Sequence, residues 1–164
     1  GTLDRKKLAG YYRRILEIGQ QEYQLQPAFV FLEFVHDLRT IDHALEVLRA
    51  ADHPQAQTIP DTFHMHVGGT PVADLAKLAG SQIGIFQFAD APAGIPREEL
   101  KDHHRVLPGD GILPLVEALR RLRATGYVGA ISLELYNPDY HKRDPDAFLA
   151  EAHAKTLAVI ELSA

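Results

Sequence analysis

The 164-residue chain contains no cysteine, so it has neither disulfides nor thiolate chemistry, and we expect a cytoplasmic protein. It also lacks a signal-peptide pattern and any apolar run long enough to cross a bilayer, which predicts no membrane partner. Basic residues do not cluster and the net charge is −5, so we expect no nucleic-acid partner. The remaining composition, 46% hydrophobic and 24% charged, is that of one globular domain with its own core.

An initiator methionine is missing too. The chain begins at Gly1, and Met65 is its only methionine. We therefore expect either a processed tag at this end or a piece cut from a longer protein.

Four short apolar segments predict strands, and each ends in a side chain that can bind a metal ion. The strand-end residues are Glu33, Asp61, Gln87 and Glu134, and the strands cover residues 27–34, 57–61, 82–88 and 128–135. Helical spacing, caps and breakers predict helices between them, over residues 4–20, 40–53, 70–80, 113–124 and 144–160. Residues 66–69 and the long segment 89–110 are predicted to be loops.

This alternation predicts an α/β fold with a parallel sheet and right-handed crossovers. We expect residues 1–164 to form a single (β/α)4 half-barrel domain, a fragment equivalent to the C-terminal half of a (β/α)8 TIM barrel of roughly 250–300 residues. The alternative is a flavodoxin-like open sheet, but the glycine-rich phosphate loop typical of that fold is absent from the sequence.

The strand-end residues point to a metal site, because ligands bind at the carboxyl ends of parallel strands. Four oxygen donors suit a hard divalent cation. Glu33 and Glu134 each stand in an apolar run, where a carboxylate is costly unless it is paired or ligates a metal. Simpler interpretations stay open: Glu33 faces the solvent end of its strand or pairs with Arg39, and Gln87 is a hydrogen-bonded core amide.

Two further residues are candidates for binding substrate. His64 follows Asp61 by three positions, and Arg105 offers a fork of donors to a substrate oxyanion or carboxylate. The alternative for the first pair is that Asp61 caps a turn and His64 is an ordinary loop histidine. His103 and His104 are interpreted as a solvated pair, because adjacent residues rarely point at one ion.

Four motifs in order, DTFHMHVGG (61–69), IFQFAD (85–90), RVLPGDG (105–111) and GYVGAISLELYNPDY (126–140), resemble the xylose-isomerase-like TIM barrels. Within that superfamily the chain is most similar to the sugar phosphate isomerase/epimerase proteins, from about residue 25 to residue 160. The resemblance implies one divalent ion held by Glu33, Asp61, Gln87 and Glu134. It also implies that His64 and Arg105 bind substrate oxygens and that Glu33 and Glu134 are the catalytic acid/base pair.

The chain departs from that family pattern in two places. Gln87 stands where most relatives have histidine, which favours Mg²⁺ or Mn²⁺, with Co²⁺ or Zn²⁺ as alternatives. Four strands that would begin a complete barrel are absent.

We therefore predict a metal-dependent enzyme of carbohydrate metabolism, an isomerase or epimerase. It acts on a small sugar or hydroxy-keto acid through a metal-stabilised enediolate. The first alternative is a lyase similar to 3-dehydroshikimate or inosose dehydratase. The second is a non-catalytic half-barrel. Open sheet edges predict a homo-oligomer in either case, and we expect the chain alone to be inactive.

Overall fold

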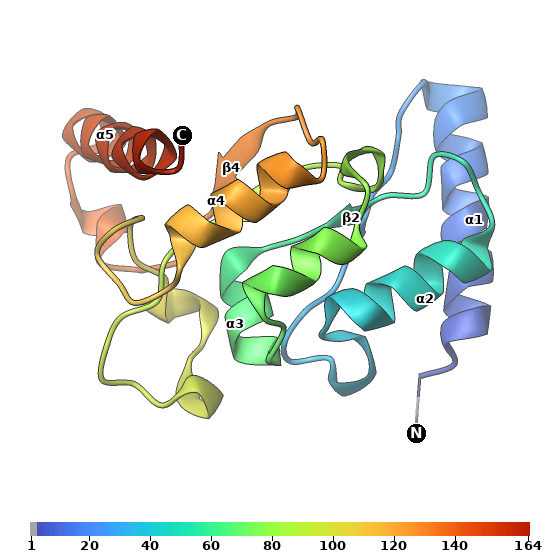
Figure 1. Ribbon diagram of the computed structural model, residues 1–164, viewed down its shortest axis with the longest axis horizontal. Helices are drawn as coiled ribbons and strands as arrows, with labels where there is room; N and C mark the ends of the chain where they lie inside the picture. Colours follow the sequence, from blue (N-terminus) through green and yellow to red (C-terminus); the bar gives the residue numbers. More distant parts are fainter. Residues whose placement is uncertain (1–2) are drawn as a thin grey trace.

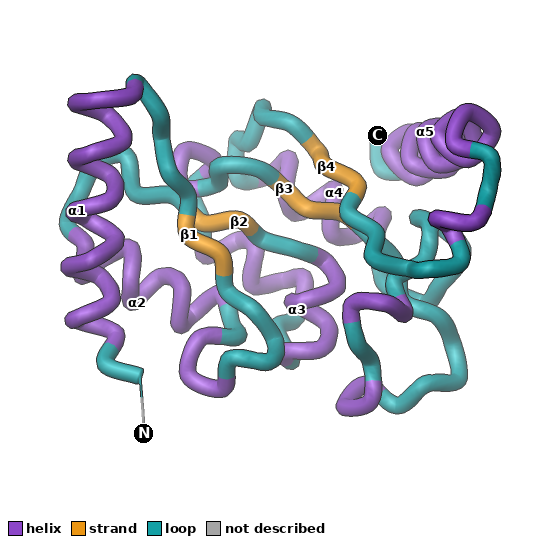
Figure 2. The backbone as a smooth tube through the Cα atoms, turned by 180° about the vertical axis from the view of Figure 1, so that it is seen from behind, coloured by secondary structure: helices purple, strands orange, loops and turns teal. Residues whose placement is uncertain are grey.

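The computed structural model describes residues 3–164, and its centre is a row of four short parallel strands. These are β1 (Phe29–Val30), β2 (Thr58–Ile59), β3 (Phe86–Phe88) and β4 (Ile131–Leu133). β1 pairs with β2 and β3 pairs with β4, both in parallel. Parallel bridges from Thr58 to Ile83 and from Asp61 to Gln87 join the two pairs, so the order follows the chain (Figure 2). The predicted parallel α/β fold is confirmed.

In the described part of the chain, five α-helices accompany the strands: α1 (Arg5–Tyr23), α2 (Ile41–Ala51), α3 (Thr62–Gly68), α4 (Leu115–Ala124) and α5 (Pro145–Leu162). α1 and α5 lie at opposite ends of the molecule (Figure 1). Three predicted caps are present, since Asp4, Thr40 and Asp144 each accept a hydrogen bond from a backbone N–H of the helix that follows. Short 3₁₀ helices occupy His36–Leu38, Val72–Lys77, Gly80–Gln82, Arg97–Glu99, Asp102–His104 and Tyr140–Lys142.

The segment after β2 differs from its prediction. Residues 66–69 were expected to be a loop, but α3 continues to Gly68 and ends at Gly69, whose φ is 82°. The helix forms because the Asp61 carboxylate caps it, accepting hydrogen bonds from the N–H groups of Phe63 and His64.

The predicted helix over residues 70–80 is also wrong. Only Val72–Lys77 is helical, and it is 3₁₀. Pro71 has extended ψ and lies before this helix instead of at its first position, so Thr70 is not the cap. Gly80 starts a new turn and donates its N–H to the Thr125 carbonyl; an added Cβ there would clash with the backbone of Gly126. Close backbone packing, not helix termination, explains this glycine.

The core lies between the strands and the helices α2 and α4. Its centre contains Phe31, Phe86 and Phe88, with Leu45 from α2 and Leu119 from α4. In Figure 2 the strands lie in front of these two helices. A second cluster packs α1 against α2. No helix in residues 3–164 is long and apolar enough to span a membrane.

The last helix is packed less tightly than its sequence predicts. Ala152 is buried, as expected, but Leu149 is 63% exposed and Leu157 is 41% exposed. α5 packs against α4, and most of its other residues are exposed, so two residues predicted to point inward are not covered.

Candidate functional site

The predicted site residues come from the carboxyl ends of the strands. Glu33 lies in the turn after β1, Asp61 follows β2, and Glu134 directly follows β4. Arg105 comes from the long loop after β3, and His64 lies in the first turn of α3. Residues separated by up to 101 positions in sequence numbering, 33 to 134, thus gather at one edge of the sheet.

Asp61 is completely buried, and its two carboxylate oxygens have different roles. Its Oδ1 accepts from the N–H groups of Phe63 and His64, which fixes the start of α3. Its Oδ2 accepts from Arg105 Nη1 at 2.8 Å. The turn-capping alternative is therefore correct for one oxygen, while the other belongs to the site.

Arg105 is the centre of the site and is also completely buried. Its guanidinium donates to Asp61 and to Asp102 Oδ1, and its Nη2 lies 3.1 Å from His64 Nε2. Nη1 lies 3.7 Å from Glu134 Oε2. Burial opposes the charge, but Asp61 and Asp102 outweigh it and raise the pKa of Arg105 above its ordinary value. The guanidinium is thus a permanent, fully paired cation.

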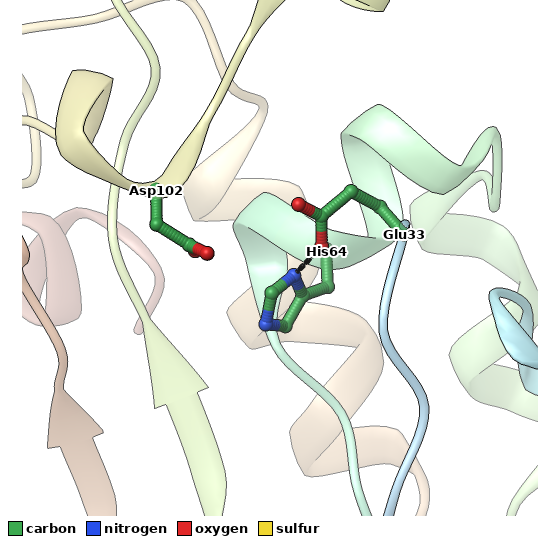
Figure 3. A group of neighbouring side chains, drawn as sticks. All are labelled: Glu33, His64 and Asp102. Carbon is green, nitrogen blue, oxygen red and sulfur yellow. Dashed lines mark ion pairs between the residues drawn. The ribbon is translucent and has the colours of Figure 1, made fainter. Parts of the chain in front are cut away.

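His64 links Arg105 to Glu33. His64 is 5% exposed, and its Nδ1 lies directly against Glu33 Oε2 (Figure 3). This pairing replaces the alternative in which Glu33 pairs with Arg39. Burial lowers the pKa of His64. The hydrogen bond to Glu33 and the charge of Asp61 raise it by more than burial lowers it, so the net pKa is raised.

The second ring nitrogen of His64 argues against a protonated ring. Arginine can only donate hydrogen bonds, so Nε2, facing Arg105 Nη2, must accept. We therefore assign the proton to Nδ1 and a neutral ring in this arrangement. The direct contact with the fixed Arg105 guanidinium decides between the neutral and the protonated ring.

The pKa values of the two glutamates of the site are shifted in opposite directions. Burial raises the pKa of Glu33, yet the hydrogen bond with His64 lowers it, the charge of Arg105 adds to that lowering, and the net pKa is lowered. Burial raises the pKa of Glu134, and the neighbouring Asp61 adds to the rise, although Arg105 opposes it. The Tyr136 hydroxyl donates to Glu134 Oε1 at 3.2 Å. One carboxylate is therefore poised to be ionised and the other to hold a proton.

Gln87 lies beside this network through its backbone. It pairs with Ser132 on β4 and bridges to Asp61. Its side chain is partly buried and makes no hydrogen bond within residues 3–164, unlike the hydrogen-bonded core amide of the alternative interpretation.

A metal ion has two overlapping sets of candidate ligands. In residues 3–164, one group of three offers ligand atoms that all lie within 4.8 Å of one another: Glu33, His64 and Asp102 (Figure 3). Two carboxylates and an imidazole suit a divalent ion. Asp61 and Glu134, from the predicted set, instead face Arg105. Both sets fit a divalent ion by donor chemistry and share Glu33, and the predicted four-ligand set stays a prediction.

Sequence reasoning missed two aspartates. Asp102 precedes Arg105 by three positions, and that i, i+3 acid–base spacing was the available signal. Asp90 is 1% exposed, and its carboxylate accepts hydrogen bonds from the N–H groups of Ala91, Gly109, Gly111 and Leu113. Asp90 follows β3 as Asp61 follows β2, but it organises the loop that carries Arg105 instead of joining the site.

A family model described as "Xylose isomerase-like TIM barrel" matches residues 22–158. The chain belongs to this family. The match contains every strand and every residue of the network, so the predicted superfamily is confirmed.

The relatives of the chain have different reactions in their names. An inosose isomerase of Halalkalibacterium halodurans is 32% identical over 135 residues, covering 80% of this chain and 48% of the relative. A 3-dehydroshikimate dehydratase of Pseudomonas putida is 32% identical over 118 residues, covering 71% of this chain and 18% of the relative. These names confirm the prediction of an enzyme family.

Among solved structures, that of the IOLI protein "with a binding zinc atom" superposes with a TM-score of 0.84 and 23% identity. It covers 98% of this chain and 59% of the neighbour, and it supports the fold. The chain spans about half the length of the inosose isomerase it matches.

Proposed function

We propose that the protein is a divalent-metal-dependent isomerase or epimerase that moves a proton next to the carbonyl group of a sugar-like substrate. The observation that carries this proposal is the buried network of Glu33, His64, Arg105, Asp61 and Glu134 at the carboxyl ends of four parallel strands. Its two glutamates differ in proton affinity, which is what acid/base catalysis at one carbon centre requires.

Glu33 and Glu134 are the proposed catalytic residues. Glu33, with its lowered pKa, accepts the proton from the carbon next to the carbonyl. Glu134, with its raised pKa, returns a proton. The two roles exchange in the reverse reaction, so the same pair serves isomerisation and epimerisation.

His64 and Arg105 are the proposed substrate-positioning residues. The neutral His64 ring and the buried guanidinium contact each other and hold fixed positions between the two glutamates. A bound divalent ion would supply Lewis acidity for the enediolate. Its proposed ligands are Glu33, Asp61, Gln87 and Glu134. His64 and Asp102 are the alternative donors around Glu33.

A dehydratase is the second candidate. The 3-dehydroshikimate dehydratase of Pseudomonas putida is as similar in identity as the inosose isomerase, at 32% for each. Loss of a β-hydroxyl from the same enolate needs the same proton abstraction by Glu33, so both reactions fit one acid/base pair.

Exchange of substrate carbon-bound hydrogen with solvent deuterium tests the proposal, because it needs one proton abstraction and no complete turnover. The chain, loaded with Mn²⁺ or Mg²⁺, is incubated with an inosose in D₂O and the exchange is followed by NMR. We expect exchange above the rate with free metal, and loss of that excess in Glu33→Gln. Absence of metal-dependent exchange in the folded protein would count against the assigned chemistry.

A further inference from the structure

Arg105 is surrounded by more negative charge than it can balance. Three carboxylates form ion pairs with it, from Asp61, Asp102 and Glu134. A fourth, from Glu33, lies behind His64. Four carboxylates therefore share one network with a single guanidinium. With all four carboxylates ionised and the His64 ring neutral, a divalent ion added to it would still leave one negative charge in excess.

The donors of Arg105 are also committed. A guanidinium has five N–H groups. Nε and Nη2 both donate to Asp102 Oδ1, at 3.0 and 2.9 Å, and Nη2 also faces His64 Nε2. Nη1 donates to Asp61 and has Glu134 as its second acidic neighbour.

The faces of the guanidinium are occupied as well. The Phe63 ring centroid lies 4.7 Å from Arg105 Cζ, and that of Tyr136 lies 5.6 Å away. An arginine that recognises a carboxylate or phosphate presents an open edge with two parallel donors. The Nε–Nη2 edge is the one suited to that role, and Asp102 fills it.

We propose that Asp102 determines the charge selectivity of the site: by filling the Nε–Nη2 edge of Arg105, it makes the site accept neutral polyhydroxy ligands and reject carboxylates and phosphates. This inference rests on the proposed function for its substrate class, and it narrows "sugar or hydroxy-keto acid" to neutral ketoses and cyclic polyols. Arg105 then positions His64 and the two glutamates instead of binding an anion. An anionic substrate would need a cation other than Arg105.

Asp102 is suited to this task because it lies outside the strands and the α-helices. It lies in the 3₁₀ helix Asp102–His104, and its side chain is 34% exposed, in contrast to the fully buried Asp61. Its substitution removes an ion pair of the site without removing a helix cap or a core contact. Charge and occupancy at Arg105 can therefore be changed while the fold is kept.

The test is a gain of anion binding, measured with inorganic phosphate as the probe. The ¹⁵N–¹H signal of Arg105 Nε is followed by NMR in the 164-residue chain, in Asp102→Ala and in Asp102→Asn. Alanine frees the edge and removes the charge, whereas asparagine removes the charge and keeps an acceptor oxygen. We expect no saturable shift in the natural chain, at least tenfold tighter binding in Asp102→Ala, and intermediate binding in Asp102→Asn.

Two controls separate selectivity from general charge effects. Asp139→Asn removes the same charge from an exposed site, where the carboxylate pairs with Lys142, and should leave Arg105 unresponsive to phosphate. Asp102→Glu should restore rejection. Saturable phosphate binding at Arg105 in the natural chain, or none in a folded Asp102→Ala variant, would overturn the proposal. Because the readout needs no turnover, it stands apart from the deuterium-exchange test.

Discussion

At the scale of single residues, the buried hydroxyl of Tyr12 connects three segments of the chain through hydrogen bonds. Tyr12 is 5% exposed, and its hydroxyl donates toward the carbonyl oxygens of Pro27 and Gln57 and accepts from the Gln57 N–H. It thereby ties α1 to the segments that enter β1 and β2. Burial raises the pKa of Tyr12, and the backbone hydrogen bond opposes the rise only in part.

A raised tyrosine pKa makes stability depend on alkaline pH. The unfolded chain loses the Tyr12 proton near pH 10 and the folded chain loses it only at higher pH, so the folded state binds more protons in between. This contribution to stability is complete below about pH 10 and is lost as the pH rises through the folded pKa. We expect Tyr12→Phe to reduce the alkaline fall in unfolding free energy and to cost about 1–2 kcal/mol at neutral pH. Urea unfolding across the pH range measures both.

Tyr11 is the matched control, because it is adjacent on the same helix and 57% exposed. Tyr11→Phe should leave the pH dependence as it is. An equal flattening in both variants would contradict the role given to the buried hydroxyl.

Asp90 is the second buried residue whose hydrogen-bond partners organise a segment of the chain. Each of its oxygens accepts two backbone N–H groups at 2.8–3.1 Å, and together they fold the loop that carries Arg105. Asp90→Asn places an NH₂ group against two of these donors, and we expect a loss of about 2–4 kcal/mol in unfolding free energy. Chemical denaturation measures it. The exposed Asp139→Asn should change stability by no more than about 0.5 kcal/mol, and a similar cost in both variants would be evidence against this loop anchor.

At the scale of elements, one glycine in each of two helices is predicted to affect stability in opposite directions when it is changed to alanine. Gly68 ends α3 against the backbone of Arg39, and an added Cβ would clash with that carbonyl oxygen. Gly10 lies inside α1 with open space where a Cβ would point. Gly68→Ala should therefore destabilise the protein, whereas Gly10→Ala should stabilise it by about 0.5–1 kcal/mol through helix propensity.

Thermal unfolding of the two alanine variants measures this contrast, with the unsubstituted chain as the reference. Since α3 contains His64 and is capped by Asp61, Gly68→Ala should also shift the NMR signals of His64, which Gly10→Ala leaves unchanged. Stabilisation by Gly68→Ala would show that α3 does not depend on this close approach.

At the scale of the whole molecule, the row of strands is open at both edges. No residue of β1 or β4 is fully buried, and the aromatic residues beside the site, Phe34 and Tyr136, are 67% and 53% exposed. We expect the chain to self-associate, with a second copy covering these surfaces, and to have little turnover alone, because an uncovered site admits water and holds substrate loosely.

Light scattering tests association, and Phe34→Ser should shift the chain toward the monomer. The control is Val128→Ser. Val128 is 97% exposed and precedes the start of β4, away from the site. A chain that stays monomeric at high concentration, or a monomer with full isomerase turnover, would contradict this expectation.

The sequence by itself determined the order of elements and the candidate residues. Helical spacing in α1, α2 and α4 and caps at Asp4, Thr40 and Asp144 are local features, so they could be identified without tertiary contacts. Strand-end acids at Glu33, Asp61 and Glu134 followed from the same local pattern, and family motifs supplied their proposed roles.

Only the tertiary structure decided how these residues are partnered. Asp61 caps a helix whose last residues were predicted to be a loop, and Arg105 is enclosed by Asp102 instead of facing outward. Leu149 and Leu157 stay exposed because no segment of residues 3–164 covers them fully. Each outcome depends on which segments meet in space, over separations as large as the 44 positions between Asp61 and Arg105. Pairing energy and burial act between such segments, and a local pattern contains no information about them.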